Sequence, residues 1–152
     1  MALKVLLILV LTFNLLSCSK KETAIYVPSK KNNPYILYEQ GLNAFEKNDF
    51  FYASEKFSEA EINFEKPELA AKSSIMASFS LYGINFYRDA IDNLERYLKT
   101  YPADKHNIYA HYLIAVIYYE QISDEKKDLK PLIKADQKID FFLKKYPKSD
   151  YS

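Results

Sequence analysis

Residues 87–102 have the sequence YRDAIDNLERYLKTYP, and this stretch carries the pattern that decides the fold. Ala90, Leu94 and Tyr97 are spaced by four and three residues, so they lie on one face of an α-helix. The same spacing recurs 37 residues earlier as Ala53-x3-Phe57-x2-Ala60 and 45 residues later as Ala135-x3-Ile139-x2-Phe142. The last two copies are also followed by Tyr-Pro at the same offset. The sequence therefore predicts a repeated helical unit.

Each copy is preceded by another helical stretch that contains a small residue. Gly41 and Ser78 each lie twelve positions before the alanine that opens the pattern. In the third copy the matching residue, Ala115, lies twenty positions before Ala135. The eight additional residues predict an insertion between the two helices of the third repeat, near residues 122–131.

These residue types suit pairs of helices that pack closely as hairpins. A small residue on the first helix and an alanine on the second let the two axes approach, and Phe57, Leu94 and Ile139 fill the space between neighbouring pairs. Only two glycines occur, and no segment alternates long enough to form a strand. We therefore expect an all-α fold of about six helices, a solenoid of about three hairpins that resembles tetratricopeptide repeats (TPRs). An irregular helical bundle is the alternative. The predicted TPR domain covers residues 35–152, with repeats at approximately 35–66, 67–102 and 103–147.

The N-terminal segment has the features of an export signal. Lys4 is followed by an apolar stretch that is too short to span a bilayer but suits a secretory signal. Leu15-Leu16-Ser17-Cys18 resembles the lipobox of bacterial lipoproteins, and Cys18 is the single cysteine of the chain. The resemblance implies a signal peptide at 1–17 and a lipid anchor on Cys18, with ordinary secretion as the alternative. Residues 18–34 are polar and contain two lysine pairs, so we expect a flexible tether.

Composition and motifs disfavour nucleic-acid binding and catalysis. The chain has 21 Lys and Arg residues against 20 Asp and Glu residues, without the basic excess that nucleic-acid binding requires. His106 and His111 are five residues apart, which does not suit a metal pair on one helix face, and no phosphate loop or nucleophile elbow is present. We expect no cofactor, no metal site and no enzymatic activity. The acidic pairs Glu59/Glu61 and Asp136/Asp140 are interpreted as solvated side chains or partners of lysines one helical turn away.

The lipobox, the tether, the repeats and the insertion together resemble the BamD (ComL-type) family of outer-membrane assembly lipoproteins. The motifs that carry the resemblance are AID-x-L-x-R-Y-L at 90–98 and the Tyr-Pro pair that leads to Asn107-Ile108-Tyr109-Ala110. The family has five repeats, so a chain with three is expected to be a fragment or a shortened relative. The resemblance implies a BamA-like barrel subunit, other lipoproteins of the assembly machinery and unfolded outer-membrane proteins as partners. Docking on the barrel subunit uses the family's C-terminal repeats.

In tetratricopeptide arrays the first helix of each pair lines a concave face. The positions three to four residues from the packed small residue would then form a groove for an extended peptide, and most of them are Tyr or Phe. These positions are Tyr35, Tyr38, Leu42, Phe45, Ile75, Phe79, Tyr82, Tyr109, Tyr112, Val116 and Tyr119. A tyrosine ring buries well while its hydroxyl can bond a peptide backbone. The alternative is that these rings simply pack between repeats.

The sequence thus predicts a scaffold anchored by lipid to the outer membrane and facing the periplasm. Its predicted role is to bind the signal peptides of unfolded outer-membrane proteins and to hold partner subunits. A periplasmic tetratricopeptide lipoprotein for pilus assembly or cell-envelope maintenance is the second hypothesis. A secreted hydrolase is the third, and no residue recommends it.

Overall fold

A computed structural model describes residues 32–122 and 128–152 of the chain. The predicted signal peptide, Cys18, most of the tether and the centre of the predicted insertion, residues 123–127, lie outside the described residues. Pro34, which the sequence analysis assigned to the tether, is the first residue of a helix. Within the described ranges no helix combines the length and the apolar character needed to cross a bilayer.

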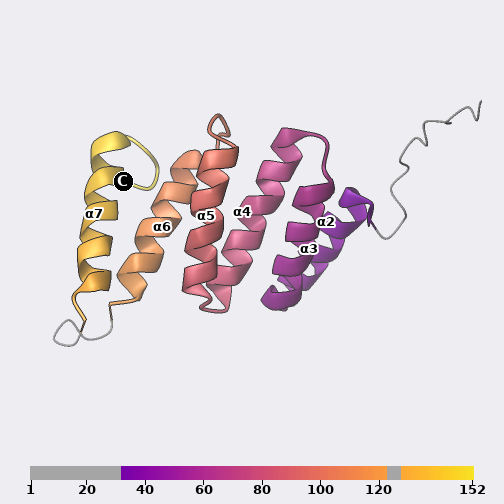
Figure 1. The fold of residues 1–152 in the computed structure, drawn as a ribbon, viewed down its shortest axis with the longest axis horizontal. Coiled ribbons are helices and arrows are strands. Elements are labelled where there is room, and N and C mark those ends of the chain that lie inside the picture. Colours follow the sequence, from indigo (N-terminus) through magenta and orange to yellow (C-terminus); the bar gives the residue numbers. More distant parts are fainter. Residues whose placement is uncertain (1–31, 123–127) are drawn as a thin grey trace, which may run out of the picture.

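Six helices follow one another and form three hairpins that lie in a row (Figure 1). The helices are α2 (Pro34–Glu46), α3 (Phe50–Asn63), α4 (Pro67–Gly83), α5 (Tyr87–Thr100), α6 (Asn107–Glu120) and α7 (Lys130–Lys145). Prolines at the first or second position open α2, α4 and α7, where the missing N–H has no helical partner to lose. The described residues contain no strand. The prediction of an all-α tetratricopeptide-type fold is therefore confirmed.

The first two hairpins turn through the same backbone geometry. Asn48 and Asn85 lie 37 residues apart, and both have a φ of 61°, in the left-handed region. Asparagine tolerates this region better than most residues because its short polar side chain bonds locally. Each of these turns has three residues between its helices, whereas nine residues separate α6 from α7.

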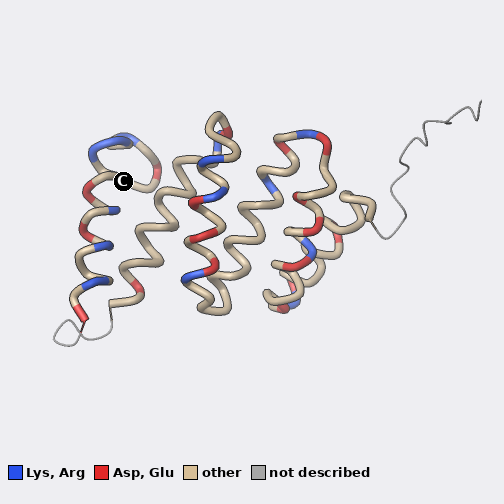
Figure 2. The backbone as a smooth tube through the Cα atoms, in the orientation of Figure 1, with Lys and Arg blue, Asp and Glu red and all other residues tan. Residues whose placement is uncertain are grey.

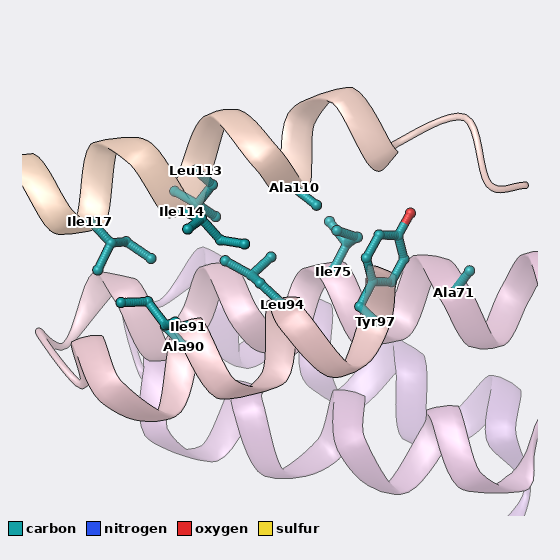
Figure 3. Close-up of a cluster of buried hydrophobic side chains, with 10 residues drawn as sticks. All are labelled: Ala71, Ile75, Ala90, Ile91, Leu94, Tyr97, Ala110, Leu113, Ile114 and Ile117. Atoms are coloured by element: carbon teal, nitrogen blue, oxygen red, sulfur yellow. The ribbon is translucent and has the colours of Figure 1, made fainter. Parts of the chain in front are cut away.

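The repeated pattern packs as the sequence predicts in the first two hairpins. Phe57 and Leu94 are fully buried, and Gly41 is so close to Phe57 that an added Cβ would lie 2.7 Å from two of the ring carbons. The larger core cluster joins α4, α5 and α6 (Figure 3). It consists of Ala71, Ile75, Ala90, Ile91, Leu94, Tyr97, Ala110, Leu113, Ile114 and Ile117. Ile139 differs from its predicted role, because its side chain on α7 is 37% exposed.

Alanines and serines make up all but one of the buried residues of helix α4, the exception being Ile75, so the helix presents little side-chain bulk to its neighbours. Ser73, Ser78 and Ser80 are fully buried, and each hydroxyl donates a hydrogen bond to the backbone carbonyl four residues earlier, at 2.8–2.9 Å. These bonds satisfy the polar hydroxyls without adding bulk. Helix α4 can therefore pack tightly against both α3 and α5.

The two series of helices differ in charge. Figure 2 shows that Lys, Arg, Asp and Glu concentrate on α3, α5 and α7, while α4 and α6 are nearly free of them. Helix α6 contains a single charged residue, Glu120. Neighbouring second helices are joined by ion pairs, Glu61–Arg96 between α3 and α5 and Glu95–Lys138 between α5 and α7. Neighbouring first helices are joined instead through aromatic side chains. We call the side made by α2, α4 and α6 the aromatic face.

Candidate functional site

The aromatic face begins with ring contacts between the first two hairpins. Phe45 on α2 lies 5.7 Å from Phe79 on α4, measured between ring centroids, and Phe79 lies 5.8 Å from Tyr82. Phe45 also contacts Phe50, and Tyr82 contacts Tyr87, at 5.1 and 6.3 Å. These tilted and edge arrangements are those that aromatic quadrupoles favour. The rings form a connected series across α2, α4 and the start of α5.

Glu120 extends this series to α6. The Tyr82 hydroxyl donates a hydrogen bond to one Glu120 carboxylate oxygen at 2.8 Å, and the Tyr87 hydroxyl lies 3.3 Å from the other. Burial, together with the bond to Glu120, raises the pKa of Tyr82 to about 12. Tyr82 therefore stays protonated as a donor at neutral pH. The single charged side chain of α6 is therefore held by two phenols of the second hairpin, one on α4 and one on α5.

At the third hairpin the rings gather around the end of the described chain. Tyr112 stacks on Tyr151 with centroids 4.9 Å apart and planes at 25°, and Tyr109 contacts the same ring at 5.7 Å. A pocket of about 240 Å³ opens beside them between α6 and α7. It is lined by Tyr112, Ala115, Val116, Tyr119, Ile139, Phe142, Leu143 and Tyr151.

The structure brings most of the predicted groove residues to the aromatic face, but their contacts and their exposure differ. Phe45, Phe79 and Tyr82 touch in sequence, as do Tyr109 and Tyr112, while Val116 and Tyr119 line the pocket. Leu42 is exposed on α2. Tyr35 and Tyr38 contact Phe64, the residue that caps α3, and Tyr38 also contacts Phe57 within α3, so both rings pack against the second half of their own hairpin.

Ile75 corrects the predicted groove. Its side chain is buried in the larger core cluster beneath α6 (Figure 3) and is not presented to a ligand. Its predicted position followed from counting three residues back from Ser78. Spacing within one helix does not predict that α6 of the next hairpin covers α4 at Ile75.

The sequence reasoning missed Phe50, Tyr87, Glu120 and Tyr151. The 37-residue register contains a signal for two of them, because Phe45 and Phe50 shifted by 37 become Tyr82 and Tyr87. Both pairs are in ring contact, so the same contact is repeated in consecutive hairpins. Glu120 and Tyr151 fall outside any repeated pattern, and no sequence signal indicated them.

Glu61 corrects the interpretation of the acidic residues as solvated side chains. Its side chain is buried at the α3–α5 contact, where Arg96 donates two hydrogen bonds of 2.7 Å, one to each carboxylate oxygen. Tyr101 donates a third bond at 3.0 Å. The bonds to Glu61 also raise the pKa of the Arg96 guanidinium. Arg96 belongs to the motif at 90–98, and its structural task is to join the first two hairpins. Glu59 and Asp140, in contrast, do pair with lysines on their own helices.

His111 on α6 contacts the aromatic side chains at the end of α7, and we expect this contact to depend on pH. Its ring lies against Phe141 and Tyr146, at 5.1 and 5.7 Å. Burial lowers the pKa of His111 to about 4, and Lys145 and Lys138 add repulsion. In the unfolded chain His111 has its ordinary pKa of 6.5, so between pH 6.5 and 4 it is protonated in the unfolded chain but not in the folded chain. The free energy of unfolding should therefore fall as the pH drops through this window.

The measurement is chemical denaturation of the full chain and of a His111→Phe variant at several pH values between 7 and 4. The variant keeps an aromatic ring in the contact but cannot be protonated, so its stability should fall less steeply over this range. Parallel stability curves for the two proteins would contradict the assignment to His111.

The fold and the aromatic face define a helical-repeat scaffold of the tetratricopeptide type. The chain belongs to the YfiO family of outer membrane lipoproteins, whose family model matches residues 30–152. It is similar to the outer membrane protein assembly factor BamD of Caulobacter vibrioides, with 28% identity over 134 residues, which is 88% of this chain and 43% of the relative. It is also similar to BamD of Rickettsia prowazekii, with 27% identity over 116 residues, 76% of this chain and 46% of the relative. The chain thus spans less than half the length of these two relatives.

Proposed function

We propose that this chain is a non-enzymatic scaffold in the assembly of outer-membrane β-barrel proteins, and that it holds an extended segment of an unfolded substrate on its aromatic face. The observation that carries the proposal is the pair of ring groups on one side of the molecule, Phe45–Phe79–Tyr82 and Tyr109–Tyr112, on helices with few charged side chains. Membership of an outer membrane lipoprotein family, and the similarity to two outer membrane protein assembly factors, support the same setting.

The chemistry of the face suits an extended peptide with apolar and aromatic side chains. Rings give contact area at a low cost in conformational entropy, and phenolic hydroxyls such as that of Tyr119 can bond a peptide backbone. Tyr119 is 63% exposed, so its ring is accessible to a ligand. A barrel strand that has not yet entered a sheet has this composition, with alternating apolar side chains and unpaired backbone groups.

The proposed setting is the periplasmic face of the outer membrane. Lipid on Cys18 would anchor the chain there, and the residues between Cys18 and the start of α2 at Pro34 would separate the helices from the membrane surface. Two or three acyl chains hold far more firmly than one, since each buried methylene contributes about 0.8 kcal/mol. The proposed partners are a BamA-like barrel subunit, other lipoproteins of the same machinery and unfolded outer-membrane proteins.

Purification of the full chain from detergent-solubilised membranes tests this setting. Co-purification of a large barrel subunit supports β-barrel assembly. Co-purification of pilus or cell-wall proteins instead would favour the alternative, a tetratricopeptide lipoprotein of pilus assembly or envelope maintenance.

Replacing Tyr82 or Tyr112 with alanine should weaken the binding of a barrel-strand peptide by about tenfold each, the loss of roughly 1.4 kcal/mol typical of an aromatic hot spot. The measurement is a fluorescence titration with a labelled peptide of alternating apolar residues that ends in phenylalanine. Tyr52→Ala is the matched control, because Tyr52 is 41% exposed on α3 and lies outside the aromatic face. Unchanged affinity in both test variants, with circular dichroism showing intact helices, would refute peptide binding on this face.

A further inference from the structure

The two junctions between neighbouring hairpins share a layout but differ in chemistry. At the junction of the first and second hairpins, the carboxylate of Glu61 binds Arg96 and Tyr101, and these residues line a hollow of about 470 Å³. In the repeat register Glu61 corresponds to Leu98, 37 residues later, and this residue carries no charge. Arg96 corresponds to Phe141, 45 residues later. The ion pair of the first junction is therefore not repeated at the second.

A cavity of about 500 Å³ opens at this second junction, at the edge of the molecule where α5 ends, α6 begins and α7 ends (Figure 1). It is lined by Glu95, Leu98, Lys99, Pro102, Asn107, His111, Lys145 and Tyr146. Its volume is within the roughly 300–1,000 Å³ of ligand pockets. The hollow at the first junction is open although another hairpin follows it, so the openness of this cavity does not result from the place of the third hairpin in the row.

The cavity presents two lysines whose charge no described acid neutralises. Lys99 on α5 and Lys145 on α7 are exposed, and neither forms an ion pair within residues 32–122 and 128–152. The Lys145 ammonium lies 5.1 and 5.2 Å from the centroids of two aromatic rings near the end of α7, and this contact positions it. Glu95, the acidic residue of the wall, is paired with Lys138 at 3.5 Å. The cavity is therefore suited to an anion.

The other lining residues narrow the kind of anion. Asn107 donates one amide N–H to the Pro102 carbonyl at 2.7 Å, and its second N–H has no acceptor among the residues that the structure describes. His111 has its pKa lowered to about 4, so it is neutral at pH 7 and adds no charge. An amide donor with two ammonium groups suits a single carboxylate. Leu98 and Pro102 add apolar surface, and the carboxylate in the wall disfavours a ligand dense in phosphate.

We propose that this cavity is a docking site for an acidic segment of a partner protein. A glutamate or aspartate of that segment would bind Lys99, Lys145 and Asn107, and a neighbouring apolar residue would contact Leu98. The cavity contains none of the residues of the predicted groove, so the inference does not depend on peptide binding at the aromatic face. It gives the scaffold a second contact, for a protein other than the unfolded substrate.

Titration of the full chain with a short labelled peptide of alternating glutamate and leucine tests the docking site. Lys99→Met and Lys145→Met should each weaken binding by about three- to tenfold, because each removes a charged donor but keeps an unbranched side chain. Lys145→Arg keeps the charge and should retain most of the affinity. Lys134→Met is the matched control, because it removes an exposed lysine of α7 outside the cavity, and it should change nothing. Ring resonances of His111 should shift when the peptide is added.

The contrary outcomes are distinct. Equal affinities for the unmodified chain and both methionine variants would overturn the docking site, as would equal binding of the same peptide with glutamine in place of glutamate. A preference for phosphatidylglycerol vesicles over neutral ones that is lost in both variants, without binding of the acidic peptide, would assign the lysines to a membrane surface and also overturn it. Thermal midpoints close to that of the unmodified chain show that the variants are folded.

The same titrations separate this inference from the proposed function. Tyr82→Ala should leave the affinity for the acidic peptide unchanged, and the two methionine variants should leave the affinity for the peptide that ends in phenylalanine unchanged. Failure of the aromatic face to bind its peptide would therefore not affect the docking site. Loss of acidic-peptide binding in Tyr82→Ala would place that peptide on the aromatic face and overturn the docking site.

Discussion

Replacing Phe57 with alanine should lower the free energy of unfolding by about 3–5 kcal/mol, the range found for large-to-small changes at fully buried rings. Phe57 has no exposed surface, and its ring lies directly against Gly41 of α2. Its ring contacts Tyr38 at 5.2 Å and occupies the space that the missing Cβ of Gly41 leaves open. The neighbouring side chains cannot fill the resulting cavity without moving a helix, so the lost contacts are not replaced.

The same substitution at Phe51 provides a matched control on the same helix. Phe51 is 55% exposed, and its ring lies 6.5 Å from that of Phe86, in the turn before α5. Phe51→Ala should cost less than about 1 kcal/mol. Urea denaturation followed by circular dichroism gives both values. Equal losses for the two variants would show that Phe57 is not the residue that holds the first hairpin together.

The second large effect concerns the ion pair that joins the first two hairpins. Arg96→Ala should lower the free energy of unfolding by about 2–3 kcal/mol, because the buried carboxylate of Glu61 then loses two of its three hydrogen bonds. The value lies below that of a fully buried pair because the Arg96 side chain is 48% exposed to solvent. Arg96 also donates to Ser74 and Asn93, so its loss affects α4 as well.

Two comparisons isolate the buried charge as the cause. Arg88 lies on the same helix but is almost fully exposed, and its pair with Asp92 spans 4.0 Å, so Arg88→Ala should change stability by no more than about 0.5 kcal/mol. In the Glu61→Gln background the carboxylate charge is absent, and Arg96→Ala should cost clearly less than in the unmodified chain. Additive losses for the two substitutions would contradict a direct coupling between Glu61 and Arg96.

Sequence periodicity predicted the helices and their packing within each hairpin better than it predicted which helix surfaces stay exposed. Helical spacing and a 37-residue register predict which residues pack within a hairpin, and Ala53, Phe57, Ala90 and Leu94 are all fully buried. The coverage of each hairpin by the next depends on the angle between them, which spacing does not specify. Ile75 is therefore buried where a groove residue was expected, and Glu61 is buried where a solvated residue was expected.

In the third hairpin the opposite occurs, because a residue that the spacing predicts to be buried is partly exposed. Ile139 occupies the position of Phe57 and Leu94 in the repeated pattern, but no further described helix covers it. Tyr151 reaches the rings of α6 through a turn whose path the repeat pattern does not encode. The candidate site was therefore predictable for Phe45, Phe79, Tyr82 and Tyr112, which follow the register. It was not predictable for Glu120 and Tyr151, which do not occupy positions of the repeated pattern.

The serines of α4 have a bearing on ligand preference, although none of them lies among the rings. Their hydroxyls donate hydrogen bonds to the backbone of their own helix, so they need no space from neighbouring helices. Because these side chains are small, they set how closely α3 and α5 pack against α4. Exchanges among serine, alanine, cysteine and threonine at these interior positions would alter the distances from α4 to α3 and α5, and with them the spacing of Phe50, Phe79 and Tyr87, without replacing any ring. Homologous chains can in this way differ in the peptides they prefer through substitutions at buried residues that do not contact the peptide.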